Sequence, residues 1–369
     1  MNIRHAIATW ARAAMVAALT LAGPLAQAQG GAIVLGQSLA LTGPGSVIAA
    51  PYHQGARLFL ERLNATGGIQ GRRIELLTLD DQGDPARTAA HTRKLMDQGV
   101  LALFGYVGSP QVTAAYPILK DSDLLLFAPL SAADEFRGAL YPNVYALRPG
   151  YSEEAAAITR HAETLGARRL GILHAADGEA LAALDAAERT MTGLGANLVA
   201  RAPVAGGLDK LVAARPESVL VIAEPGAAAA AIKALRAKAF RGPIYGFSTT
   251  GESLLADLLG PAGAGVVVVR VVPRSDDARL PVVRALHESA GAAGLGRPNV
   301  YMLEGYLAAR AMAEALRRAP QPTRAKLRKA LESLDDMNLG GFRVHFAGAR
   351  VGSRLVELSL IDSQGRVRE

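Results

Sequence analysis

The residues best suited to binding chemistry are serines in short segments that join a predicted strand to a predicted helix. Ser109 follows the apolar segment Ala102–Gly105 and precedes Pro110, and proline favours the first turn of a helix. A helix over Gln111–Asp121 would leave backbone N–H groups free at its N-terminus, where they attract anions. Ser109 therefore predicts either an anion-binding position or a helix cap, because serine is also a preferred capping residue.

Patterns typical of catalysis are weak in this chain. The seven histidines show no i,i+4 pair and no HExxH spacing, which argues against a zinc site. The segment Gly246–Gly251 misses the GxSxG nucleophile pattern by one residue. The acids Asp80 and Asp81 suggest Mg²⁺, but paired acids at a strand end are more often solvated or capping a helix. The absence of cysteine excludes disulfides, thiolate metal sites and ligated iron–sulfur clusters. We expect no enzyme, no metal and no cofactor.

The N-terminus has the pattern of a secretory signal peptide. Arg4 and Arg12 precede an apolar run over Ala13–Ala22, and Ala26-Gln27-Ala28 fits the small-x-small rule of a cleavage site. The run is shorter than the roughly 20 residues of a membrane-spanning helix. We expect residues 1–28 to be removed, together with Trp10, the one tryptophan. Without a cysteine for a lipid anchor, the product is predicted to be a soluble periplasmic protein.

The basic charge does not indicate a nucleic-acid partner. The formal net charge is +7, and loss of Arg4 and Arg12 leaves +5. The arginines are spread over different predicted helices and turns, among acids, and no basic stripe carries aromatic stacking partners. We therefore expect no nucleic acid among the partners.

The chain of 369 residues alternates between short apolar strands and segments of helical period, which at this length predicts about two α/β domains. The first series of strands is expected at Ile33–Leu39, Ile74–Leu79, Ala102–Gly105 and Leu124–Phe127. The second series is expected at Leu170–His174, Leu198–Ala202, Val219–Ala223, Ile244–Phe247 and Val266–Val272. Helices between successive strands predict parallel sheets with helices on both faces. Near the C-terminus, Phe342–Phe346 and Leu355–Ile361 are expected to form a hairpin.

A series of motifs in order resembles the type I periplasmic binding proteins of the leucine/isoleucine/valine-binding family. The motifs are Leu35–Ser38 with Leu41–Pro44, Asn64–Arg72, Leu79–Asp81 with Asp84-Pro85, Gly105–Ser109, Phe127–Ala133, Arg148–Tyr151 and Leu303–Tyr306. Together they cover nearly all of residues 32–369.

The resemblance implies two Rossmann-like α/β lobes with parallel central sheets, joined by three crossovers, with a ligand held between them. On this chain, lobe 1 would comprise residues 32–147 plus 273–338. Lobe 2 would comprise residues 148–272 plus 339–369. The crossovers would lie at Arg148–Tyr151, Pro273 and Leu339–Gly341. Ligands of open α/β sheets bind beyond the carboxyl ends of the strands, which agrees with a site between the lobes.

The resemblance also implies which residues hold the ligand. The hydroxyl at Ser109 would bind a ligand carboxylate, and Ser131 would join it in the next loop, where Leu130 to Ala132 supply backbone donors. Tyr151 at the crossover would close over the ligand or pack the hinge. From the second lobe, Glu224 and Ser248 would contact the rest of the ligand, whereas Tyr106 and Ile48 are weaker candidates that suit a wall or core position.

This chain departs from the amino-acid binders of the resembled family at three positions. The loop His174–Gly178 lacks the aromatic residue expected there, and Glu224–Gly226 replaces a second aromatic residue. The acid that pairs with an α-ammonium group falls near Ser248. Either Glu224 or Asp177 replaces that acid, or both are solvated acids at strand ends. A small carboxylate without an amino group therefore fits as well as an amino acid.

These observations predict the solute-binding component of an ABC importer. It would trap an amino acid or another small carboxylate by hinge closure and present it, as a monomer, to permease subunits in the inner membrane. The alternative is a periplasmic sensor subunit that signals to a receptor or histidine kinase. A third possibility is a decayed paralogue without a high-affinity ligand.

Overall fold

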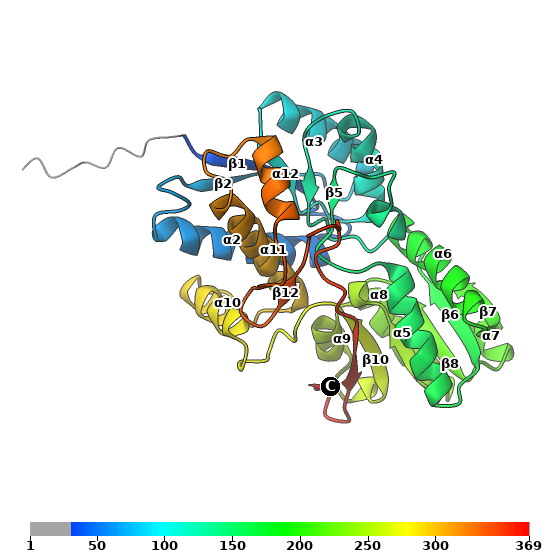
Figure 1. Ribbon diagram of the computed structural model, residues 1–369. Helices are drawn as coiled ribbons and strands as arrows, with labels where there is room; N and C mark the ends of the chain where they lie inside the picture. The colour runs from blue at the N-terminus through cyan, green and yellow to red at the C-terminus, as the bar shows by residue number, and fades with distance from the viewer. Residues whose placement is uncertain (1–30, 369) are drawn as a thin grey trace, which may run out of the picture.

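The computed structural model describes residues 31–368, so the predicted signal peptide over residues 1–28 lies outside the described residues. The chain forms two α/β bodies around two large sheets, one at upper left and one at lower right in Figure 1. Both sheets have helices on both faces, and the predicted α/β fold class is confirmed.

The first sheet has the order β2-β1-β3-β4-β5, and all of its neighbouring strands pair in parallel. Its strands are β1 (Ile33–Leu39), β2 (Ile74–Asp80), β3 (Ala102–Phe104), β4 (Leu126–Phe127) and β5 (Val144–Tyr145). Sequence periodicity missed β5 because two residues are too short to show a period.

Alternate residues of these strands face two different cores, as the two-residue period of a strand requires. Ile33 and Leu35 of β1 pack with α2 (Ser46–Ala65), α10 (Pro281–Ala292), α11 (Val300–Arg317) and α12 (Arg324–Glu332). Leu103 of β3 packs on the opposite face with α3 (Pro85–Asp97) and α4 (Ser109–Leu119). The helices α10 to α12 therefore complete the first lobe, although they lie far from β1 in the sequence, because they cover one face of the first sheet.

The second sheet has the order β14-β13-β10-β9-β8-β6-β7. Its strands are β6 (Arg169–His174), β7 (Asn197–Pro203), β8 (Ser218–Ile222), β9 (Ile244–Gly246), β10 (Val266–Arg270), β13 (Glu357–Ile361) and β14 (Val367–Arg368). Strands β6 to β10 are parallel, whereas β13 joins β10 in antiparallel orientation and β14 pairs antiparallel with β13.

The helices of the second lobe also cover both faces of its sheet. One face packs against α5 (Tyr151–Thr164) and α6 (Gly178–Gly193). The other face packs against α7 (Leu208–Ala213), α8 (Pro225–Ala237) and α9 (Glu252–Leu259). The buried strands β8 and β10 read as continuous apolar runs because neither face of the sheet is exposed to water.

The predicted hairpin between Phe342–Phe346 and Leu355–Ile361 is wrong. Instead, β12 (Arg343–Val344) folds back on β11 (Met337–Asn338). Gly340 and Gly341 permit this tight turn because both have positive φ, 84° and 108°, which glycine adopts without a steric penalty. The side-chain oxygen of Asn338 accepts hydrogen bonds from both of their backbone N–H groups.

The third connection between the bodies also differs from the expected one. Leu339, Phe342, Val344 and Phe346 are buried in the core beneath α11, although the sequence assigns residues 339–369 to the second lobe. Ala146 and Val351 form a parallel bridge beyond this segment, and the chain then enters β13 of the second sheet. The chain therefore crosses after residue 351, because the four apolar side chains are buried in the first core. The other lobe boundaries stay predictions.

Candidate functional site

A cavity of about 400 Å³ lies where the carboxyl ends of the two sheets face one another. Ala40, Val107 and Leu130 line it from loops that follow strands of the first sheet, and Ile222 and Thr249 line it from the second. Most of the remaining lining is also apolar. The charged residues that line the cavity, within residues 31–368, are the acids Asp177, Glu179 and Glu224, and no lysine or arginine lines it.

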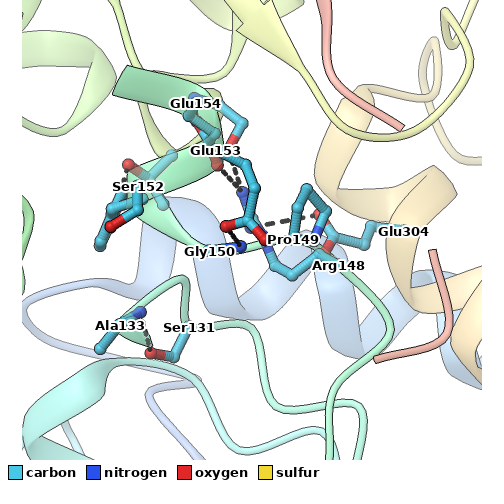
Figure 2. Close-up of polar contacts among 12 residues, drawn as sticks. Ser131, Ala133, Arg148, Pro149, Gly150, Ser152, Glu153, Glu154 and Glu304 are labelled. Carbon is cyan, nitrogen blue, oxygen red and sulfur yellow. Dashed lines mark hydrogen bonds and ion pairs between the residues drawn. The ribbon is translucent and has the colours of Figure 1, made fainter. Parts of the chain in front are cut away.

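Ser109 is buried and begins α4. Its neighbours Gly108, Pro110 and Gln111 line the cavity, whereas Ser109 and Ser131 themselves lie behind that wall. The preceding Gly108 has a φ of 101°, and a Cβ atom there would lie 2.1 Å from the side chain of Gln111. Glycine adopts this positive φ without a steric penalty. The hydroxyls of Ser109 and Ser131 lie 2.6 Å apart. The Ser131 hydroxyl also accepts the N–H of Ala133 at 3.3 Å (Figure 2). The structure therefore brings the two predicted serines together.

A carboxylate of the chain itself occupies the N-terminus of α4. The backbone N–H of Ser109 donates to Oε2 of Glu179 at 2.5 Å, and the hydroxyl of Tyr151 donates to Oε1 of the same carboxylate. Burial, followed by the nearby Glu179 charge, raises the pKa of Tyr151 well above its ordinary value. Glu179 belongs to the first turn of α6 in the second lobe, so the contact spans the cleft.

Sequence reasoning missed Glu179. An acid in the first turn of a helix is ordinary, because it interacts favourably with the helix dipole. Its position two residues after Asp177, directly behind the loop His174–Gly178 that lacks the expected aromatic residue, was the available signal. That signal does not show whether Glu179 is solvated or reaches Ser109, because the answer depends on how closely the two lobes approach.

Three further predicted residues, Leu130, Ala132 and Tyr106, lie near the two serines, and each has a polar group that is bonded within the chain. The Leu130 N–H donates to the carbonyl of Tyr106 at 2.8 Å, and the Ala132 carbonyl accepts the N–H of Tyr151 at 2.8 Å. Leu130 lines the cavity, whereas Tyr106 lies in the core beneath α4 with its hydroxyl 3.1 Å from Thr92. The structure thus places Tyr106 away from the cavity, and Ile48 at its wall.

The predicted acids Glu224 and Asp177 both line the cavity. Asp177 caps α6, because its side chain accepts the N–H of Ala180 at 2.9 Å. Glu224 precedes α8 without capping it, and its Oε1 approaches Gly45 at the start of α2 in the other lobe. Desolvation, and then the neighbouring Asp177 charge, raises the pKa of Glu224.

Ser248 is buried in a polar network at the first crossover and does not line the cavity. Its hydroxyl and backbone N–H donate to the two oxygens of Glu154 at 2.7 and 2.8 Å, and its hydroxyl also accepts a hydrogen bond from Arg148. Figure 2 shows Arg148 between Glu154 and Glu304, with a nitrogen 3.5 Å from an oxygen of each carboxylate. Burial raises the pKa of both glutamates, and the Arg148 charge opposes this rise. This network connects the crossover to both lobes.

Two α/β lobes, joined by crossovers and enclosing a cavity at the carboxyl ends of their sheets, define a two-lobed binding protein. A family model described as "Periplasmic binding protein" matches residues 32–354. The chain belongs to this family, and its resemblance to the leucine/isoleucine/valine-binding proteins is confirmed. These relatives are solute-binding proteins and not enzymes.

Two curated relatives and one solved structure show the range of similarity. The leucine-, isoleucine-, valine-, threonine- and alanine-binding protein of Pseudomonas aeruginosa is 30% identical over 111 residues, 29% of this chain and 30% of that protein. The chemotactic signal transduction system substrate-binding protein BasB of Halobacterium salinarum is 28% identical over 230 residues, 58% of this chain and 55% of that protein. The matches therefore span between 30% and 55% of the length of these two relatives.

A substrate-binding periplasmic protein from Ralstonia solanacearum superposes with a TM-score of 0.84 and 30% identity, covering 91% of this chain and 99% of that one.

Over residues 31–368 no helix is both long and apolar enough to cross a membrane. The same residues contain no group of three or more His, Asp or Glu side chains placed to hold a metal ion.

Proposed function

We propose that the protein is the solute-binding component of an ABC importer and holds a small organic solute between its lobes by hinge closure. The observation that carries the proposal is the cavity lined from both lobes. A ligand stabilises a closed form only if it contacts that form differently from the open one, and a cleft with two walls supplies such contacts. Export through residues 1–28 and delivery by a monomer to permease subunits in the inner membrane are parts of the same proposal.

The sequence predicts an amino acid or another small carboxylate as the ligand. The name of the Pseudomonas aeruginosa relative supports an amino acid. The acids Asp177 and Glu224 favour an amino group, because both line the cavity. Glu179 at the Ser109 N–H opposes a ligand carboxylate at that position.

The test combines thermal shift with small-angle X-ray scattering on the purified protein, using panels of amino acids, small carboxylates and small amines. At least one solute should raise the melting temperature and lower the radius of gyration. Ile48→Trp narrows the cavity and should weaken this response, whereas Leu140→Trp, at a residue 84% exposed, should not. A protein that responds to no solute, or responds equally in both variants, contradicts the proposal.

A periplasmic sensor subunit is the second candidate, because the Halobacterium salinarum relative is named as part of a chemotactic system. Both functions use the same fold and cleft. Adjacent permease and ATPase genes would support uptake, whereas an adjacent receptor or histidine kinase gene would support sensing. If the protein is a decayed paralogue, no compound in any of the panels should bind to it.

A further inference from the structure

The anion-binding position that the sequence predicts at Ser109 is filled by a side chain of this chain. Glu179 accepts the Ser109 N–H through one oxygen and the Tyr151 hydroxyl through the other. The hydroxyls of Ser109 and Ser131 are engaged with one another at 2.6 Å. A ligand carboxylate that used this anchor would have to displace Glu179 from it.

Close packing between the lobes holds Glu179 in this place. The N-termini of α6 and α4 abut, since a Cβ atom at Gly178 would lie 2.6 Å from the ring of Pro110. Asp177 caps α6 and thereby fixes the start of the helix two residues before Glu179. Tyr151 is fully buried and its hydroxyl meets Glu179 from the crossover side. Two lobes and the hinge therefore converge on one carboxylate.

The rest of the charged lining has the same sign. Asp177 and Glu224 lie on the second-lobe wall, and no lysine, arginine or histidine lines the cavity within residues 31–368. A carboxylate that displaced Glu179 would still lie near these acids without a cationic partner on the cavity wall, and like charges repel strongly where water is excluded. An ammonium group would meet acids, and an apolar group would meet Ile48, Val107 and Ile222.

We infer that Glu179 sets the ligand class of this cleft, which selects a small solute with a positively charged amine and an apolar group but without a free carboxylate. This inference rests on the proposed solute-binding function and names its substrate class. Because each carboxylate oxygen can accept more than one hydrogen bond, Glu179 can accept the ammonium group while it remains bonded to Ser109 and Tyr151.

The test uses three matched probes in isothermal titration calorimetry at pH 7. They are L-leucine, the amine that it yields by loss of its carboxyl group (3-methylbutylamine), and the acid that lacks its amino group (4-methylpentanoate). The native protein should bind the amine at least tenfold more tightly than leucine and should not bind the acid. Tighter or equal binding of leucine or the acid would overturn the inference.

Glu179→Ala empties the anchor and should reverse the order, with at least a tenfold gain for the acid and a tenfold loss for the amine. Glu179→Gln removes the charge but keeps the shape, so it should lose the amine without gaining the acid. Asp185→Ala on the same helix is the control, because Asp185 is exposed and pairs with Arg189.

If the native protein binds none of the three probes, a gain of acid binding in Glu179→Ala still supports the inference, and no gain overturns it. Should other solutes close the cleft while Glu179→Ala leaves the ligand order unchanged, the proposed function stands and the assignment of Glu179 fails. Absence of any solute binding in every variant would overturn both.

Discussion

Glu252 is the first residue of α9 and is only 2% exposed. Its Oε2 has no hydrogen-bond partner in the described part of the chain. Burial raises its pKa to about 7, although its backbone N–H and the charge of Arg270 act in the opposite direction. A carboxyl group with a raised pKa binds a proton more tightly in the folded chain than in the unfolded one.

Glu252 therefore predicts a pH-dependent stability. The protonated Glu252 side chain contributes free energy of unfolding that is fully present below its unfolded pKa of about 4.5. This contribution is lost as the pH rises through its folded pKa of about 7. The difference corresponds to about 3 kcal/mol. Glu252→Gln should remove this loss, so the variant should gain about that much free energy of unfolding, relative to the native protein, between pH 4.5 and pH 8. Urea denaturation at both pH values measures it, with exposed Glu75→Gln as control. Equal pH slopes would disprove the assignment.

The elements that build the first lobe meet most closely where α2 crosses α11. A Cβ atom at Gly55 would lie 1.8 Å from the backbone oxygen of Met302, and one at Gly305 would lie 1.9 Å from that of Tyr52. Glycine is required on both helices because backbone meets backbone here. This crossing positions the site, since Tyr52 also donates a hydrogen bond to the Ala128 carbonyl in the loop that leads to Ser131.

Gly305→Ala should force α2 and α11 apart. It should destabilise the first lobe by about 1–3 kcal/mol, the usual cost of overpacking. The matched control is Gly291→Ala in α10, where a Cβ atom meets nothing within 4 Å. Alanine should instead stabilise that helix by roughly 0.5–1 kcal/mol, because it loses less backbone entropy than glycine. Urea denaturation compares the two variants, and similar effects in both would refute the close crossing.

On the scale of the whole molecule, two of the contacts between the lobes act by different means. The Arg148 network lies at the crossover and holds two buried carboxylates. The Glu179 contact with Ser109 lies across the cleft and closes it. The first belongs to the hinge itself, whereas the second must break when the lobes separate.

Loss of the cleft contact should open the ligand-free protein. Glu179→Ala is expected to increase the radius of gyration in small-angle X-ray scattering without changing helix content, because a stabilising contact across the cleft is removed. Asp185→Ala should leave the scattering curve unchanged. Identical curves for Glu179→Ala and the native protein would show that this contact does not hold the lobes together.

Much of the fold was predictable because local sequence determines local structure. Apolar segments such as Val219–Ala223, bounded by helical periods, predicted buried parallel strands. The motif at Gly105–Ser109 predicted a loop at the carboxyl end of a strand, and the structure places it there. The partners of Phe342–Phe346 were not predictable, since an alternating run pairs equally well with several neighbours and only the Gly340-Gly341 turn and the available core decide among them.

The sequence by itself determined the fold class, which follows from periodicity, and the family, which its ordered motifs resemble. It also placed Ser109 and Ser131 in loops at adjacent strand ends. Only the tertiary structure decided that Ser248 faces Glu154 and Arg148, and that Glu179 reaches Ser109. Glu179 and Ser109 are 70 residues apart on different lobes. Their contact depends on how closely the lobes approach, and no local property of either segment encodes that distance.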